Sequence, residues 1–272
     1  MKTLLLLVLY AATLCAAPFP WPNGAKGAVT LSFDDGLPCG HQLVAPLLHS
    51  NGLHATFYLV IDSPNLRNRT EEWRAVAAMG HELGNHSLHH PCYRGKPGDL
   101  PWLAEEYNLA TYSPRRWLGE MRVANFALEL IDGRKARTFG NTCLNNYIGT
   151  GTNKVCLEEL MPQLFVAARG QYRREFIDPR QPNYNNLGCR GADGKPFEEI
   201  HEWIEAAVKE GKWLFLMFHN VGDEAGPLKS DKREFAKLVD YLAANTNRIW
   251  TAPAVDVVAF LRSRPEEVTS DQ

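Results

Sequence analysis

Thr30-Leu31-Ser32-Phe33-Asp34-Asp35-Gly36 is an apolar, β-like run that ends abruptly in two adjacent carboxylates and a glycine. Similar short runs of β-branched, aromatic and aliphatic residues recur along the chain, as expected of strands that are buried on both faces. We expect strands at 29–33, 55–61, 82–85, 137–139, 165–168, 214–218 and 249–251.

Helical patterns lie between these runs. Apolar residues recur with a spacing of three and four within 71–79, 200–208, 235–242 and 257–261, which is typical of amphipathic helices. Strands that alternate with helices indicate parallel β/α units. About seven such units over roughly 240 residues predict one α/β domain of barrel-like size.

The composition excludes some classes of function. The chain has 272 residues, of which 45% are hydrophobic and 22% charged, with a formal net charge of -2. These values are typical of a globular domain with a sizeable core. The chain lacks the excess of Lys and Arg that is typical of nucleic-acid-binding proteins. We therefore expect no nucleic-acid partner.

The N-terminus resembles a secretory signal peptide. Lys2 precedes an apolar run over 4–14, and the small residues Ala16 and Ala17 follow it. The alternative is an uncleaved N-terminal anchor, for which the run is short. We expect a signal peptide at 1–17, a Pro- and Gly-rich linker at 18–27, the domain at 28–264 and a polar tail at 265–272. The protein is then secreted (extracellular, periplasmic or cell-wall associated), with no stable membrane anchor after cleavage.

Five cysteines remain once a signal peptide carrying Cys15 is removed: Cys39, Cys92, Cys143, Cys156 and Cys189. Export permits disulfides, and an odd number leaves at least one thiol unpaired within the chain. No pair has the C-x-x-C spacing of a zinc ribbon. We expect structural cysteines, with Cys39–Cys92 and Cys143–Cys156 as the guessed bridges.

A second group of polar residues reads His86-Ser87-Leu88-His89-His90. On a helical turn, His86 and His90 would face the same way, which suits a transition metal. Two imidazoles and one carboxylate of the Asp34-Asp35 pair leave an open coordination position, as in catalytic metal sites, and the other carboxylate is then a candidate base. Taken separately, Asp-Asp-Gly is also a common turn, and the histidines could be surface or capping residues.

His219 follows the apolar run 214–218 directly. An isolated histidine of this kind is usually a strand-end residue with a backbone partner. Beside a metal site it becomes a candidate general acid for a leaving amine.

These motifs, in this order, resemble the polysaccharide deacetylase family, the NodB-homology group of carbohydrate esterase family 4. The resemblance covers 28–262 and implies a single distorted (β/α)7 barrel. It also implies hydrolysis of N-acetyl groups on acetylated polysaccharide or oligosaccharide of chitin-, peptidoglycan- or exopolysaccharide-like type. The implied cofactor is a divalent metal ion, with Zn²⁺ as the leading candidate and Co²⁺ or another divalent ion as the alternative. By resemblance, Asp35, His86 and His90 bind the metal, Asp34 is the base and His219 the acid.

Two further family motifs are poorly matched. The family's R-x-P-Y segment corresponds here to residues 137–143, which lack the proline. Asn141 is the candidate for the backbone N–H that holds the oxyanion, and Arg137 or Arg169 is the candidate partner of the catalytic Asp. Asp178 is the candidate that orients the acid histidine.

Three hypotheses follow. The first is an N-deacetylase, the second an O-acetyl esterase of the same family acting on a polymer such as acetylated xylan, and the third a catalytically silent sugar-binding protein. An ester leaving group needs less help from an acid, so tolerance of His219→Ala would favour the esterase. The third hypothesis predicts lost ligands or a lost base, and this chain retains them.

Overall fold

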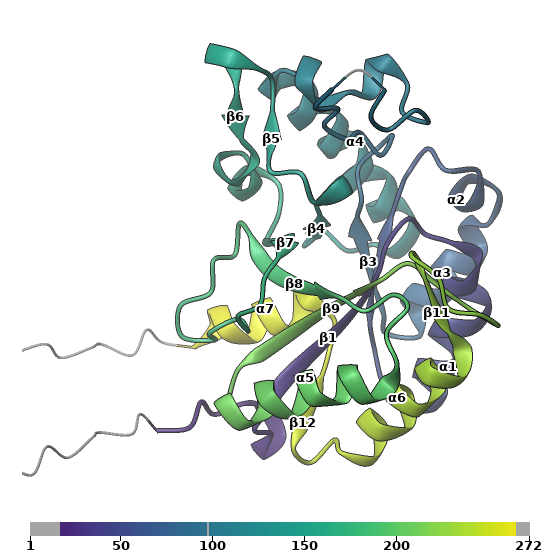
Figure 1. Cartoon of the computed structure of the whole chain (residues 1–272), viewed down its shortest axis with the longest axis vertical. Helices are drawn as coiled ribbons and strands as arrows, with labels where there is room; N and C mark the ends of the chain where they lie inside the picture. The colour runs from purple at the N-terminus through teal and green to yellow at the C-terminus, as the bar shows by residue number, and fades with distance from the viewer. Residues whose placement is uncertain (1–16, 97, 265–272) are drawn as a thin grey trace, which may run out of the picture.

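The computed structural model describes residues 17–96 and 98–264 (Figure 1). The expected signal peptide, apart from Ala17, and the expected tail at 265–272 lie outside the described residues. Within these residues the dominant feature is a parallel sheet of eight strands in the order β12-β1-β2-β3-β4-β7-β8-β9. The strands are β1 (Gly27–Phe33), β2 (Thr56–Leu59), β3 (Glu82–Asn85), β4 (Thr138–Gly140), β7 (Ala167–Tyr172), β8 (Leu187–Gly191), β9 (Trp213–Phe218) and β12 (Ile249–Thr251).

The sheet closes on itself because β9 also pairs with β1, in parallel register from Ala28 to Phe33. On the opposite edge of β1, its first half pairs with β12 and its second half with β2. β12 therefore fills the gap between β1 and β2 at one end of a seven-stranded barrel. The predicted (β/α)7 barrel is confirmed.

One barrel strand was missed in the sequence. β8 contains two glycines and an arginine and is only partly buried, so it lacks the apolar run by which the other strands were recognised. The expected strand at 249–251 is present as β12, but it lies beside the closed ring.

Helices pack around the barrel and cover the outer faces of its strands (Figure 1). They are α1 (Ala45–Ser50), α2 (Pro64–Asn68), α3 (Thr70–Ala78), α4 (Pro114–Asp132), α5 (Phe197–Glu210), α6 (Lys232–Ala244) and α7 (Ala254–Ser263). The longest, α4, begins after Ser113, whose side chain accepts from the Arg116 amide, and ends at Gly133 in the left-handed conformation.

Smaller elements connect the strands and helices, and several of them lie beyond the carboxyl ends of the strands. Two short strand pairs lie there, β5 (Tyr147–Ile148) with β6 (Val155–Cys156) and β10 (Asn220–Gly222) with β11 (Lys229–Asp231). A π-helical turn at Gly40–Val44 leads into α1. The 3-10 turns are Pro22–Gly24, Glu105–Tyr107, Leu109–Thr111, Thr142–Leu144, Gly151–Asn153, Leu157–Glu159 and Met161–Gln163.

A buried carboxyl group ties three strands and a helix together inside the barrel. Glu82 accepts hydrogen bonds from the hydroxyls of Thr56 (2.7 Å) and Thr138 (2.6 Å) and from the backbone of Thr138 and Val255. Burial raises the pKa of Glu82 despite these donors. Both oxygens of the Glu82 carboxyl group have hydrogen-bond partners. The group therefore links β2, β3, β4 and the start of α7.

The N-terminal segment, expected as a linker over 18–27, packs against the domain. Phe19 and Trp21 are 7% and 3% exposed, and their rings contact that of Phe260 on α7. The Trp21 indole N–H also donates to the Gly211 carbonyl at 3.0 Å.

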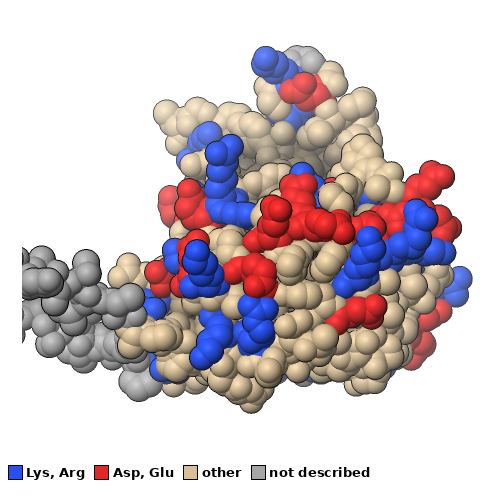
Figure 2. Space-filling view, turned by 60° about the horizontal axis from the view of Figure 1, so that its bottom comes forward, with Lys and Arg blue, Asp and Glu red and all other residues tan. Residues whose placement is uncertain are grey.

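Positive and negative side chains are interspersed on the face drawn in Figure 2, in line with the small net charge. No helix among the described residues is long and apolar enough to cross a membrane.

Two glycines offer a test of the packing. A Cβ on Gly84 of β3 would lie 2.5 Å from the ring of Tyr58, which is fully buried, whereas a Cβ on Gly119 of α4 would meet nothing within 4 Å. We expect Gly84→Ala to lower the free energy of unfolding by about 1–3 kcal/mol because the core cannot expand freely. Gly119→Ala should raise it by about 0.5–1 kcal/mol. Urea unfolding of both variants measures this difference, and equal effects would contradict the packing described.

Candidate active site

The polar residues singled out in the sequence meet at the carboxyl ends of the barrel strands. Asp34 and Asp35 follow β1, His86 follows β3, and His219 follows β9. Together they line one cavity of about 610 Å³. This is the end of the strands at which β/α barrels place their functional loops.

Three side chains in this cavity can hold a metal ion. One oxygen of Asp35 lies 3.4 Å from Nε2 of His86 and 3.3 Å from Nε2 of His90. The three ligand atoms are all within 4.8 Å of one another. The other ring nitrogen of His86, Nδ1, is 2.8 Å from the Gly140 carbonyl oxygen. Because a carbonyl only accepts, Nδ1 carries the hydrogen and the Nε2 lone pair faces the cluster, as a metal ligand requires.

The charge of Asp35 suits this role. Burial alone would raise its pKa, but the two imidazoles more than offset burial, and the pKa of Asp35 lies well below its usual range. The anion is therefore the stable form, which is the state that binds a cation.

The backbone between His86 and His90 is a tight bend, and the helical turn expected there is absent. Ser87 and His90 adopt positive φ values of 74° and 54°. The Asn85 side chain accepts from the Ser87 amide at 2.6 Å, and the Ser87 hydroxyl accepts from the His90 amide at 2.8 Å. These bonds hold a strained turn that brings the two imidazoles to 5.0 Å between ring centroids.

Asp34 is paired with an arginine in the middle of the barrel. Arg169 on β7 donates to one Asp34 oxygen at 2.7 Å, and the two side chains are 0% and 4% exposed. Of the two arginines considered, the structure places Arg169 here. Arg137 instead binds the Asp132 carboxylate at 2.6 Å, away from the cavity. Burial would lower the pKa of Arg169, but the Asp34 charge raises it above its usual value.

The second carboxylate oxygen of Asp34, Oδ1, is buried and has no hydrogen-bond partner among the described residues. A buried oxygen of this kind is costly unless something else approaches it. Asp34 lines the cavity, and Oδ1 can therefore accept a proton from a molecule bound there.

His219 is held by a carboxylate that the sequence analysis did not identify. Asp193 follows β8, and its two oxygens lie 2.6 Å from Nδ1 of His219 and 3.0 Å from the His219 amide. Burial would lower the pKa of His219, but Asp193, Asp34 and Asp35 together raise it.

Asp178 was the predicted partner, and that prediction is wrong. Its side chain is exposed and accepts from the Arg180 amide. The sequence signal for Asp193 was an Asp-Gly pair after a strand. It went unrecognised because β8 itself was missed.

Asn141 lies in the cavity wall, but its backbone N–H donates to the Arg169 carbonyl at 3.0 Å. The predicted oxyanion donor is therefore already engaged. The next two amides, of Thr142 and Cys143, begin a 3-10 turn, where N–H groups have no acceptor within the turn. Cys143 also lines the cavity, so its amide replaces that of Asn141 as the candidate donor.

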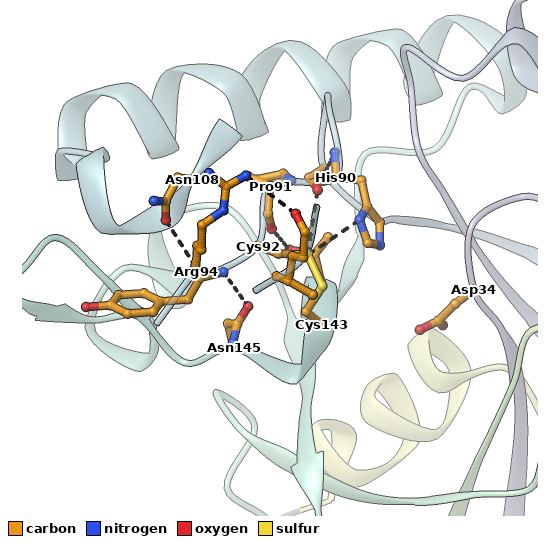
Figure 3. The surroundings of a disulfide bond; sticks show 12 residues. Asp34, His90, Pro91, Cys92, Arg94, Asn108, Cys143 and Asn145 are labelled. Atoms are coloured by element: carbon orange, nitrogen blue, oxygen red, sulfur yellow. Dashed lines mark hydrogen bonds between the residues drawn. A yellow bond between two sulfur atoms is a disulfide. The ribbon is translucent and has the colours of Figure 1, made fainter. Parts of the chain in front are cut away.

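A disulfide joins Cys92 to Cys143 (Figure 3). Both guessed bridges, Cys39–Cys92 and Cys143–Cys156, are wrong, and Cys39, Cys156 and Cys189 are free thiols. The bond ties the residue two positions beyond His90 to the loop that follows β4. Figure 3 shows His90 between the disulfide and Asp34, so the covalent link lies directly behind a metal-ligand candidate.

Hydrogen bonds reinforce this link between the two loops. The Thr142 hydroxyl donates to the Pro91 carbonyl, and the Asn145 side chain accepts from the Tyr93 amide at 2.8 Å. His90, Cys92 and Cys143 are also close enough to hold a metal together. The disulfide uses both sulfurs, so among the described residues Asp35, His86 and His90 remain as the candidate metal site.

The long segment after His90 contributes one aromatic side chain to the cavity. Trp102 is 60% exposed, lines the cavity and lies 5.9 Å from the ring of His90. Tyr112 and Trp117 are buried and serve packing.

Comparison with known proteins agrees with this geometry. The model of the polysaccharide deacetylase family matches residues 22–142, which contain Asp34, Asp35, His86 and His90. Over these residues, the chain is similar to polysaccharide deacetylases.

Solved structures share the fold of this chain. A probable polysaccharide deacetylase from Pseudomonas aeruginosa PAO1 is 13% identical, with a TM-score of 0.61 over 91% of this chain and 94% of that one. A family 4 acetyl xylan esterase from Clostridium thermocellum, solved with a cobalt ion, is 19% identical, with a TM-score of 0.52 over 88% and 93%. A curated relative, a gellan lyase from Bacillus sp, is 23% identical over 90% of this chain, which spans only 10% of the length of that protein.

The disulfide can be tested through stability. Cys92 and Cys143 are 51 residues apart in the chain, so their bond restricts a long loop in the unfolded state. We expect Cys92→Ala with Cys143→Ala to lower the free energy of unfolding by about 2–4 kcal/mol, measured by thermal and urea unfolding. Cys156→Ala, which removes a free thiol, is the control. A control that loses as much stability as the double variant would contradict the assignment.

Proposed function

We propose that the protein is a metal-dependent hydrolase that removes N-acetyl groups from polysaccharide or oligosaccharide containing N-acetylglucosamine, with release of acetate. One observation carries the proposal. A single cavity holds three candidate metal ligands, a carboxylate with a free buried oxygen, and a histidine held by a second carboxylate. These are the groups needed to add water to an acyl carbon and to protonate the departing nitrogen.

Asp35, His86 and His90 would hold the metal. Two imidazoles and one carboxylate with an open position suit Zn²⁺, and Co²⁺ accepts the same donors. When bound, such an ion supplies Lewis acidity, which polarises the acetyl carbonyl and makes a water molecule more acidic.

Asp34 is the proposed base. Its Oδ2 is occupied by Arg169 and lies 3.7 Å from Nε2 of His86, whereas Oδ1 is free. Oδ1 takes a proton from the attacking water as the new C–O bond forms. Arg169 fixes the direction of the carboxylate, so its role is positioning.

The backbone N–H of Cys143 is the proposed donor to the oxyanion that forms on the acetyl oxygen. A fixed backbone dipole is effective here because it needs no reorganisation during the reaction. The disulfide and the Thr142 and Asn145 contacts hold this amide in place relative to His90.

His219 is the proposed acid. Nδ1 is engaged by Asp193, so Nε2 is left to donate a proton to the leaving nitrogen as the C–N bond breaks. The raised pKa of His219 favours the protonated ring. An amine leaves poorly without such a proton, whereas an alcohol needs it less. This arrangement supports an amide substrate over an O-acetyl ester.

Secretion is part of the proposal. The signal-like segment at 1–17 and the disulfide near the site both support an oxidising compartment outside the cytoplasm.

Metal dependence is tested by acetate release from N-acetylglucosamine oligomers. We expect chelation to abolish release and Zn²⁺ or Co²⁺ to restore it. Asp35→Ala and His90→Ala should lose bound metal, measured by elemental analysis. Asp34→Asn should keep the metal and lose roughly 10²–10⁴-fold in turnover, because the base is gone.

His219→Ala separates the two substrate classes. It should lose turnover on the N-acetyl oligomer by a similar factor while keeping the metal. Full activity of this variant, together with release from acetylated xylan, would overturn the amide assignment in favour of an esterase.

The role of Asp193 is tested by the pH profile. His219 must be protonated to act, so activity falls as the pH rises through its raised pKa. Asp193→Asn removes the stabilising carboxylate, lowers the pKa of His219, and should move the alkaline limb of kcat to lower pH. Asp178→Asn, with an exposed carboxylate outside the cavity, should leave the limb in place. An unmoved limb in Asp193→Asn would exclude the proposed pairing.

A further inference from the structure

A second hollow, of about 730 Å³, adjoins the active-site cavity. Tyr172 lines both, and Asp193, which holds the catalytic-acid candidate His219, forms part of the wall of the second. The two hollows are therefore neighbours on the same face of the barrel, on the side of β7 and β8.

The lining of this second hollow is strongly cationic. Arg173, Arg174, Arg190 and Lys195 all line it, against a single carboxylate, Asp193, which is already bound to His219. Lys195 pairs with Glu199 at 2.7 Å. In the described part of the chain, no carboxylate forms an ion pair with any of the three arginines.

Arg190 is held in place by aromatic rings. Its guanidinium lies 4.5 Å from the centroid of the Phe176 ring and 5.2 Å from that of Trp203, and it donates to the Arg174 carbonyl. Its Nε is buried and lacks an acceptor among the described residues. An arginine fixed in this way, with donors to spare, is organised in advance for an anion.

Aromatic surface accompanies the charge. Tyr172 is 55% exposed where the two hollows meet, and Trp203 lines the second one. Exposed rings of this kind pack against the apolar faces of sugars while their polar edges remain in water.

We propose that the second hollow is a subsite for a sugar unit that carries a carboxylate, next along the polymer to the unit that is deacetylated. An arginine guanidinium can bind a planar carboxylate through two parallel hydrogen bonds. The ring of Tyr172 gives the sugar an apolar surface to pack against. The inference rests on the proposed function. It adds the preferred substrate class, which is an acidic, N-acetylated polysaccharide.

The first test is binding, which does not require turnover. The ligands are an oligosaccharide in which a uronic acid alternates with N-acetylglucosamine, and the same oligosaccharide with its carboxyl groups reduced to alcohols. Calorimetry with full-length Asp34→Asn protein, loaded with Zn²⁺, should give at least about tenfold tighter binding of the acidic ligand. The preference should shrink as salt is raised.

The second test uses matched variants and acetate release. Arg173→Gln with Arg174→Gln should reduce the acidic-to-neutral ratio of kcat/KM about tenfold. The control, Arg115→Gln with Arg122→Gln, removes the same charge from exposed arginines of α4 that line neither hollow, and should leave the ratio unchanged. Equal loss in both double variants would indicate a general field effect and overturn the subsite.

Failure of the subsite and failure of the proposed function give different results. Equal kcat/KM and equal affinity for the two oligosaccharides would overturn the subsite while acetate release upholds the deacetylase. If neither oligosaccharide releases acetate in the presence of metal, the proposed function fails. The calorimetric preference and its loss in Arg173→Gln with Arg174→Gln then decide whether the hollow binds an acidic sugar.

Discussion

The buried ion pair between Asp34 and Arg169 is the interaction on which the rest of the site depends. Removing two charges from water is costly, and the cost is recovered only when both partners are present with good geometry. The closed barrel supplies that geometry, because β1 and β7 lie on different parts of the ring and both side chains meet in its interior. Gly140 leaves room for the guanidinium, since a Cβ there would lie 2.8 Å from Nη2 of Arg169. The same Cβ would lie 2.8 Å from Cγ of Tyr58, so a larger residue at this position of β4 would press on both the arginine and this buried ring.

Around this rigid pair, the loops carry strain. Seven non-glycine residues in the described chain have positive φ, and four of them line the cavity: Asp35, His90, Cys143 and Leu144. Ser87 lies in the bend between His86 and His90, and the other two are Asn23 and Leu100. Each such conformation costs about 1–3 kcal/mol and persists only where the surroundings impose it. Here the imposing contacts are identifiable: two side-chain-to-amide hydrogen bonds in the His86–His90 bend, and a disulfide to the loop after β4. These contacts keep the ligand atoms and the candidate oxyanion amide in position before a substrate arrives.

The sequence predicted the parts of the site that are local and failed for the parts that depend on long-range pairing. Asp34, Asp35, His86 and His90 stand in two short motifs at strand ends, so their meeting follows from parallel strands alone. Arg169 and Arg137 could not be separated in this way, because both lie in or beside strands and only the barrel register decides which one reaches Asp34. Asp193 was missed because β8, with two glycines and an arginine, does not have the pattern of a buried strand. The disulfide guesses failed because cysteine pairing depends on which loops lie side by side, and local spacing does not determine that.

In the proposed mechanism, the two proton-transfer groups have opposite requirements, and the fold supplies each with a buried partner of opposite charge. The base must be a carboxylate, and Arg169, a permanent cation, is its partner on one side of the cavity. The acid must be a protonated imidazole, and Asp193 supplies the negative charge on the other side. Pairs of titratable groups in contrasting environments are what allow one site to run acid and base chemistry at one pH. Asp193 also forms part of the wall of the cationic hollow. A carboxylated sugar bound there would bring another negative charge toward His219, and direct attraction between the two would favour the protonated ring further.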